Sequence, residues 1–198
     1  MPRAALSQDQ LEDFRESLCL EATRLFAENG YEGVTMRALA KRIGCSPMTP
    51  YRYFENKAEI FDTVRAAGAD RFAEAIETAV RSHSDHPARL RAMCLAYVEF
   101  AVAEPHAYRI MFELQQPTEH PNHKERRSWY VMRAAVTEAI EEGCLNGDPN
   151  VVAHLLWSGV HGIVALHLSG MLGLGIELEE LLDAFIEREL SRTQSIST

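Results

Sequence analysis

Residues 35–57 gather side chains that can bind phosphate groups and the edges of bases. Hydroxyl, phenol and guanidinium groups follow one another at short spacing, and five basic side chains stand against one acidic side chain, a net charge of +4. From residue 61 onward the chain carries a net charge of −8, within a total of −9. A short basic segment on an acidic chain draws a polyanion to one surface. A basic segment of this kind could also be an ordinary solvated surface. The secondary structure that positions these side chains must therefore distinguish the two interpretations.

Two short helices joined by a tight turn would position these groups. Thr35 is predicted to cap a helix over residues 36–43, which Gly44 ends in a left-handed conformation. Ser46 is a further N-cap, with Pro47 at the first helical position, where a missing N–H costs nothing. A helix, a turn and a second helix in this order predict a helix-turn-helix.

Helical spacing predicts which sides of the two helices are buried. The apolar face of the first helix consists of Leu39, Ala40 and Ile43. The buried side of the second helix, at steps of three residues, consists of Met48, Tyr51 and Phe54. The outward side then consists of Thr49, Arg52 and Tyr53, whose groups can engage base edges and phosphates.

Pro50 falls inside the second predicted helix. At the fourth helical position it removes the first intrahelical donor, so we expect a local distortion or a shortened helix. In an alternative registration, Thr49 caps a helix that starts at Pro50, and different side chains then project. Both registrations stay open at this point.

The segment resembles the DNA-binding domain of the TetR family of bacterial repressors. The resemblance covers about 50 residues and starts at residues 25–35, Leu-Phe-Ala-Glu-Asn-Gly-Tyr-Glu-Gly-Val-Thr. Its motifs are the helix start at Thr35, the turn Gly44-Cys-Ser46 and the run Tyr51-Arg-Tyr-Phe-Glu-Asn-Lys57. The resemblance implies a three-helix head, a variable ligand-binding body and a dimer whose recognition helices enter successive major grooves.

The resemblance also implies roles for single residues. The positions that match DNA-facing places are Ser46, Thr49, Tyr51 and Tyr53. Thr35 and Lys57 match phosphate contacts at helix N-termini. Arg37 and Arg52 join them because of their charge and expected exposure.

The chain as a whole predicts an all-α fold of about nine helices, because helical spacing recurs and strand patterns are nearly absent. Besides the two helices of the motif, the predicted helices cover residues 8–29, 57–82, 87–103, 105–115, 124–145, 149–172 and 177–192. Ser7 and Gly30 are expected to bound the first of them. We expect a loop over 116–123 and disorder after residue 192. Residues 1–56 are predicted to form the DNA-binding domain, and residues 57–198 the ligand-binding and dimerisation domain.

Large apolar and aromatic side chains in the body are candidates for a ligand cavity, although each singly would suit an ordinary core. They are Met93, Tyr97, Phe100, Met111, Phe112, Trp129, Met132, Trp157 and His161. The stretch from Trp157 to Gly170 resembles a TetR subgroup marked by Trp-x-x-x-His-Gly. His161 also suits a hydrogen-bonded structural histidine. Gly159 and Gly162 would permit close packing against a partner chain.

Several other classes of function are disfavoured by the sequence. No apolar run reaches the roughly 20 residues of a membrane span, and the N-terminus lacks a secretory signal, so we expect a cytoplasmic protein. The four cysteines are widely spaced, which favours free buried thiols. The pairs His83/His86 and His120/His123 have spacings a metal could use, but they lie in predicted loops, so no metal is expected. No catalytic motif is present, and neither an enzyme nor a cofactor is predicted.

Taken together, the sequence predicts a homodimeric repressor that a small hydrophobic or amphipathic ligand releases from an inverted-repeat operator. The dimer is expected to form through the last two helices, at about residues 149–192. An activator and a ligand-independent DNA-binding regulator of the same fold are the alternatives.

Overall fold

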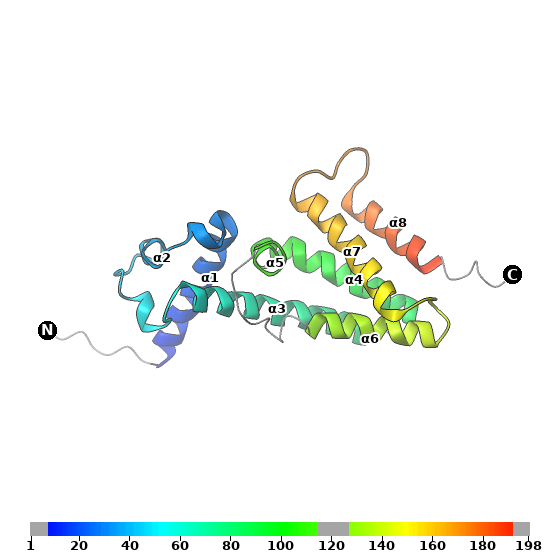
Figure 1. The fold of residues 1–198 in the computed structure, drawn as a ribbon, viewed down its shortest axis with the longest axis horizontal. Helices are drawn as coiled ribbons and strands as arrows, with labels where there is room; N and C mark the ends of the chain where they lie inside the picture. Colours follow the sequence, from blue (N-terminus) through cyan, green and yellow to red (C-terminus); the bar gives the residue numbers. More distant parts are fainter. Residues whose placement is uncertain (1–7, 115–126, 192–198) are drawn as a thin grey trace. The chain divides into compact units, whose positions relative to one another are not determined.

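The computed structural model describes residues 8–114 and 127–191, and within these ranges all regular secondary structure is helical (Figure 1). Eight α-helices and one 3₁₀ helix are present in the described ranges, without a strand, which confirms the all-α prediction. The elements are α1 (Gln8–Gly33), α2 (Met36–Ile43), the 3₁₀ helix η1 (Pro50–Arg52), α3 (Lys57–Arg81), α4 (His86–Ala103), α5 (Pro105–Phe112), α6 (Arg127–Glu141), α7 (Pro149–Leu168) and α8 (Leu178–Ser191). The predicted cap Ser7, the loop over 116–123 and the tail after residue 192 lie outside the described residues.

Local chemistry sets both ends of α2 and the start of α7 where the sequence predicted them, whereas α5, α6 and α7 end before the predicted residues 115, 145 and 172. Gly30 interrupts α1 with φ of 71°, and Gly44 ends α2 with φ of 77°, a region that suits glycine. The Thr35 hydroxyl accepts a hydrogen bond of 3.1 Å from the backbone N–H of Ala38. In the body, the Asp148 carboxylate caps α7 by accepting from the next backbone N–H groups.

The chain packs as two compact units, and the first contains the predicted head. It comprises the described residues up to Gly68, together with those from His106 onward in and after α5. Phe26 meets Phe61 edge to face with 4.9 Å between the ring centroids, and Ile110 of α5 is fully buried in the same core. Helix α5 and the first half of α3 therefore pack with the head, while the functional boundary at residue 56 stays a prediction.

The second unit contains the rest of α3 from Ala69, together with α4, α6, α7 and α8. Helix α7 is 20 residues long with a mean hydropathy of 1.6, so by length and composition alone it could cross a membrane. The expectation that no apolar run has this length was wrong for α7. Helix α7 contacts α4, α6 and α8, and only 28% of its apolar window is buried.

Gly159 and Gly162 lie in α7 but differ in their surroundings. A Cβ atom at Gly159 would overlap the ring of Phe185 in α8, whereas a Cβ atom at Gly162 would meet nothing within 4 Å. Gly159 therefore serves the crossing of α7 and α8 within one chain, which corrects the prediction that it faces a partner. Gly162 stays available for a partner chain.

An ion pair between α3 and α6 makes the stability of the second unit depend on pH. Arg127 donates hydrogen bonds of 2.6 and 2.8 Å to the two carboxylate oxygens of Glu77, which lowers the pKa of Glu77. A lowered pKa stabilises the fold at pH values above the ordinary range of glutamate, and this contribution is lost as the pH falls through the lowered pKa. The stabilisation should therefore be complete at neutral pH and absent in acid.

We expect Arg127→Gln to lower the melting temperature at about pH 7, and the difference from wild type to shrink as the pH falls below about 4. Arg133→Gln is the matched control, because Arg133 of α6 donates its 2.6 Å bond to the neutral amide oxygen of Asn150. Its effect should not depend on pH. Equal pH dependence of both variants in calorimetric melting would contradict the assignment.

Candidate DNA interface and ligand cluster

Tight turns and the three-residue 3₁₀ helix η1 (Pro50–Arg52) stand over residues 46–54 in place of the predicted second helix. The Thr49 N–H donates to the Ser46 carbonyl at 2.9 Å, and the Tyr53 N–H donates to the Pro50 carbonyl at 3.0 Å. Pro50 has no N–H to offer the Ser46 carbonyl, so the bonds close over three residues and an α-helix from Ser46 does not form. The alternative registration, with a helix starting at Pro50, matches the structure. The Thr49 hydroxyl makes no cap bond there and instead pairs with the Ser46 hydroxyl at 2.9 Å.

The buried side of this segment differs from the predicted one. Pro50 and Phe54 are buried, and Tyr53 packs against Phe14 with 5.1 Å between ring centroids. Met48 is 69% exposed and Tyr51 is 48% exposed. The predictions that Met48 and Tyr51 face the core and that Tyr53 faces outward were therefore wrong. The prediction assigned the large apolar residues to the buried side because of their spacing. It treated Pro50 only as a helix breaker, although the Pro50 ring is buried.

Lys57, the predicted phosphate ligand, is held by groups of its own chain. Its ammonium donates to the Tyr31 carbonyl at 2.9 Å, lies 4.1 Å from the centroid of the Tyr31 ring, and pairs with Glu32 at 3.7 Å. These contacts fix the start of α3 against the end of α1. The role of Lys57 at a phosphate stays a prediction, to which the structure adds a role in the packing of the head.

The basic side chains of the head are partly neutralised within the unit. Arg42 pairs with Glu21 at 3.2 Å and with Glu28 at 3.8 Å. Arg37, Lys41 and Arg52 are exposed. The hydroxyl of Thr35, predicted to contact a phosphate, is already the acceptor of the α2 cap bond. The positive charge that can meet DNA is thus smaller than the sequence count, and it lies on and beside α2 and η1.

The two tyrosines of the segment should behave differently when they are truncated. We expect Tyr51→Ala to leave the melting temperature unchanged within error, because Tyr51 is half exposed. Tyr53→Ala should lower the stability of the head by about 1 kcal/mol, since it removes the ring contact with Phe14. Thermal unfolding of both variants, followed by circular dichroism, checks this expectation. A larger loss for Tyr51→Ala than for Tyr53→Ala would contradict the assigned faces.

In the body, three of the candidate ligand residues form one hydrogen-bonded group. The indole N–H of Trp157 donates to the Tyr97 hydroxyl at 3.3 Å, and the same hydroxyl is bonded to Nδ1 of His161 at 3.0 Å. Tyr97 is 4% exposed, and Phe72 of α3 meets its ring edge to face at 5.1 Å. The hydrogen bonds therefore join α4 and α7, and the ring of Phe72 adds an apolar contact from α3 in the second unit.

Further aromatic rings extend this group. Trp129 of α6 lies 4.2 Å from the His154 ring and 6.0 Å from Trp157, measured between centroids. His154 was not predicted, although its spacing of three residues from Trp157 and seven from His161 places all three on one side of α7. Phe72 was also missed, because no spacing links α3 to this group.

The other predicted ligand residues are distributed over both units. Met93 and Phe100 are buried in α4, and Phe100 meets Phe72 at 5.1 Å between centroids. Met132 is half-buried in α6. Met111 and Phe112 belong to α5, in the first unit.

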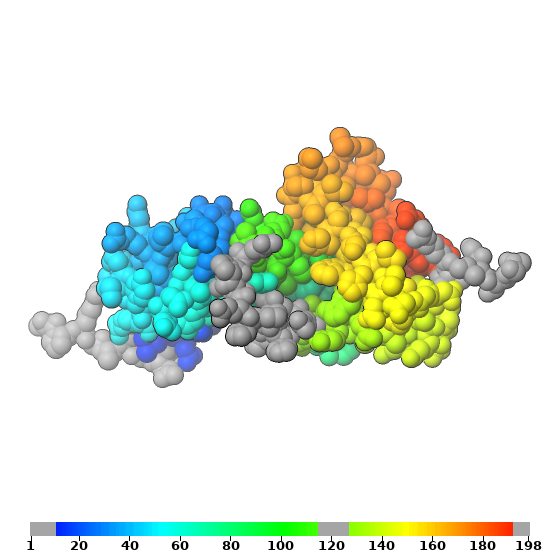
Figure 2. Space-filling model, viewed as in Figure 1, coloured from blue at the N-terminus to red at the C-terminus, as the bar shows by residue number. Residues whose placement is uncertain are grey.

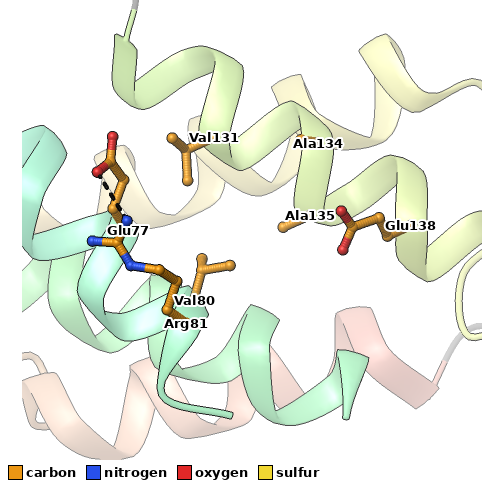
Figure 3. Close-up of a pocket in the computed structure, with 7 residues that line it drawn as sticks. All are labelled: Glu77, Val80, Arg81, Val131, Ala134, Ala135 and Glu138. Atoms are coloured by element: carbon orange, nitrogen blue, oxygen red, sulfur yellow. Dashed lines mark hydrogen bonds and ion pairs between the residues drawn. The ribbon is translucent and has the colours of Figure 1, made fainter. Parts of the chain in front are cut away.

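A surface cavity of about 350 Å³ lies at another place in the second unit, between α3 and α6 (Figure 3). Its lining consists of Glu77, Val80, Arg81, Val131, Ala134, Ala135 and Glu138. None of the predicted ligand residues is among them. Both carboxylates in the lining are engaged by arginines, Glu77 by Arg127 and Arg81, and Glu138 by Arg89.

The described residues contain neither a disulfide nor a cluster of side chains that could bind a metal ion. The four cysteines are free, and only Cys94 is fully buried, which raises the pKa of its thiol to about 12. Cys19, Cys45 and Cys144 are half-buried, so the expectation of buried thiols holds only for Cys94. Residues 8–114 and 127–191 hold no group of three side chains able to bind a metal ion. His86 starts α4 and does not lie in a loop, while the pair His120 and His123 lies outside the described residues.

Comparisons with known proteins cover both parts of the chain. One relative is the HTH-type transcriptional activator FasR of Mycolicibacterium smegmatis, 28% identical over 77% of this chain and 68% of that protein. A solved structure of a protein of unknown function from Rhodococcus sp. RHA1 is 26% identical, with a TM-score of 0.78 over 97% of this chain and 98% of that chain. FadR of Bacillus subtilis, in complex with stearoyl-CoA, shares the fold at 18% identity, with a TM-score of 0.73 over 89% of this chain and 98% of that chain.

Two family models match this chain. Residues 20–64 match the bacterial regulatory proteins of the tetR family, and residues 90–188 match the tetracyclin repressor-like C-terminal domain. The first match runs from the second half of α1 through α2 and η1 into the start of α3, and the second covers half of the chain. The chain therefore belongs to the TetR family of DNA-binding transcriptional regulators.

Proposed function

We propose that this regulator is a homodimeric repressor that leaves its operator when a small amphipathic ligand binds to the body. The observation that carries the proposal is the exposed, basic segment of α2 and η1 beside an acidic body, in a chain of this family. The predicted DNA contacts are Thr35, Arg37, Ser46, Thr49, Tyr51, Arg52, Tyr53 and Lys57. Residues 1–56 are the proposed DNA-binding domain, and residues 57–198 the proposed ligand-binding and dimerisation domain.

An exposed apolar stripe along α7 supports a second copy of the chain as partner. Val151 and Leu155 are each 57% exposed, and Leu166 is 45% exposed. With Ser158 and Gly162 they follow steps of three and four residues, so they lie on one side of the helix. Figure 2 shows the surface of α7 in yellow and orange, open on the face in view. An apolar face of this kind is typical of an interface, and the same face from two chains would be self-complementary.

Sedimentation measurements test this interface. Leu155→Arg should turn the dimer into a monomer, because it places a charge in the centre of the stripe. Tyr130→Arg is the matched control, since Tyr130 of α6 is 58% exposed and lies outside the stripe. A dimer that survives Leu155→Arg at micromolar concentration would overturn the proposed interface.

The ligand class is supported by the aromatic group around Tyr97 and by a structural neighbour. Apolar walls with few polar groups suit an amphipathic molecule, and FadR, which shares the fold, was solved with stearoyl-CoA. A fatty acyl thioester is therefore the first ligand to test on this chain. FasR is named an activator, so a ligand-dependent activator is the second candidate.

The experiment measures binding of the dimer to the DNA that flanks its gene, by fluorescence anisotropy at two salt concentrations with random DNA as competitor. We expect specific binding that weakens as salt rises, because phosphate contacts release counterions. Acyl-CoA should weaken binding about 5- to 150-fold if its coupling lies in the usual allosteric range. Stronger DNA binding in its presence would favour the activator, and no effect would favour a ligand-independent regulator.

We assign no enzymatic activity and no cofactor to this chain. A regulator acts where the chromosome is, so we propose that it works in the cytoplasm of a bacterium. Retention of the protein in the soluble fraction of a lysate, with no turnover of the ligand that changes DNA binding, would be the expected result.

A further inference from the structure

Met48 stands out among the exposed residues of the head. Its side chain is 69% exposed, although a methionine usually buries much of its apolar surface. It lies between Pro47 and Thr49, on the loop that leads into η1, and Tyr51 follows three residues later at 48% exposure. A single exposed apolar residue needs no explanation, but two large ones lie here, inside residues 20–64, which match the tetR family of regulatory proteins, and on the segment that we propose binds DNA.

The backbone of the segment fixes this exposure. Pro50 and Phe54 occupy the core side of the segment and are both buried. Residues 48, 51, 52 and 55, at steps of three, one and three, are all exposed and form the opposite side. Because the Thr49 N–H is bonded to the Ser46 carbonyl at 2.9 Å, the turn that carries Met48 is closed and cannot rotate its side chain into the core without breaking this bond.

The chemistry of the outward side then has two parts. Arg52 supplies charge, and the hydroxyls of Ser46 and Thr49 supply polar groups, already bonded to each other at 2.9 Å. Met48 can neither donate a strong hydrogen bond nor pair with a phosphate. In the major groove, the apolar group that distinguishes one base is the C5-methyl group of thymine. A flexible, polarisable thioether fits such a group without demanding one geometry.

We propose that Met48 is a specificity-determining residue that reads a thymine methyl group in each half-site of the operator. The inference rests on the proposed DNA interface and adds a base preference to it. Thymine is preferred at this position because its methyl group and the Met48 side chain bury apolar surface against each other. Removal of the methyl group alone, by deoxyuridine, should weaken binding about fourfold per half-site contact, the equivalent of one buried methylene-sized group.

The experiment first selects binding sites for the wild-type dimer from a randomised pool of DNA duplexes. Each thymine of the selected site is then replaced by deoxyuridine, and the affinities of wild type and Met48→Ala are measured by fluorescence anisotropy. We expect one thymine position per half-site at which deoxyuridine weakens wild type about fourfold and leaves Met48→Ala unchanged. Leu20→Ala is the matched control, because Leu20 is a 55% exposed apolar residue on α1, outside the segment; it should keep the wild-type sensitivity to deoxyuridine.

Three outcomes separate the inference from the proposed function. Coupling between Met48 and one methyl position supports the inference. A selected site at which every deoxyuridine substitution affects wild type and Met48→Ala equally overturns the inference and leaves DNA binding intact. Failure of wild type to select any sequence overturns the proposed function, and the inference with it. Because Met48 is exposed, Met48→Ala should melt at the wild-type temperature, which excludes misfolding as the cause of a change.

Discussion

Gly159→Ala is expected to destabilise the second unit by about 2 kcal/mol, although alanine is the better helix former. A Cβ atom at this position overlaps the ring of Phe185, so the ring or the whole of α8 has to move. Overpacking of this kind costs about 1–3 kcal/mol, and the displaced ring loses its contacts as well. The gain in helix propensity, at most about 1 kcal/mol, does not offset this loss.

Urea unfolding of three variants checks this expectation. Gly162→Ala is the matched control, because the same change in the same helix meets open space within one chain, and it should stabilise the isolated chain slightly. Gly159→Ala combined with Phe185→Leu should recover part of the loss, since the smaller side chain makes room for the methyl group. Equal stability of Gly159→Ala and Gly162→Ala would show that α8 does not cross α7 at Gly159.

The two glycines also separate packing within one chain from packing between two chains. If two copies meet at the α7 stripe, Gly162→Ala should weaken the dimer while leaving the monomer intact. Gly159→Ala should weaken the monomer first. The sequence analysis predicted the same interface for both glycines because it identified their helix. It could not predict in which direction a Cβ atom at each position would point relative to α8.

Where one residue determines its own surroundings, the sequence predicted the structure well. Thr35 and Gly44 sit at the two ends of α2, because a hydroxyl caps a backbone N–H at one end and a missing Cβ atom permits the left-handed turn at the other. Gly30 likewise breaks α1 where it was expected to end. These rules act over three or four residues, so no knowledge of the tertiary fold is needed.

Where the partner comes from a distant part of the chain, the sequence could not decide. Spacing identified α5 as a helix, but Ile110 packs into the core of the head, and nothing local distinguishes this from packing in the body. Lys57 carries the charge of a phosphate ligand, yet its ammonium is bonded to Tyr31. Pro50 was counted only as a helix breaker, but it is also buried. The side of the segment that carries Met48 is therefore exposed, although the sequence predicted it to be buried.

The aromatic group of the body was predicted as a set of residues, and the structure shows which members act together. Tyr97 and His161 are 64 residues apart, so their bond depends on how α4 packs against α7. Trp157 and His161 are four residues apart on one helix, which the sequence could place on one face. The hydroxyl of Tyr97 is the atom on which both bonds converge.

Tyr97→Phe is therefore expected to lower the stability of the second unit by about 1–3 kcal/mol while keeping the ring and its contact with Phe72. The change removes one hydroxyl and leaves two groups without it: the indole N–H of Trp157, bonded at 3.3 Å, and Nδ1 of His161, bonded at 3.0 Å. Each hydrogen bond is worth about 0.5–1.5 kcal/mol, and the change removes two of them, so the effect is larger than that of one hydrogen bond. Urea unfolding at neutral pH measures this loss.

Tyr130→Phe is the matched control, because it removes a hydroxyl from a tyrosine that is 58% exposed, and it should leave the stability unchanged. Tryptophan fluorescence gives a second readout, since the chain has only Trp129 and Trp157, and Trp157 loses its acceptor in Tyr97→Phe. If Tyr97 also orients the ligand, Tyr97→Phe should change the acyl-CoA concentration that releases DNA, and Tyr130→Phe should not. A stable Tyr97→Phe variant with an unchanged emission spectrum would mean that the three side chains do not share this hydroxyl, and the cluster would then be ordinary apolar packing.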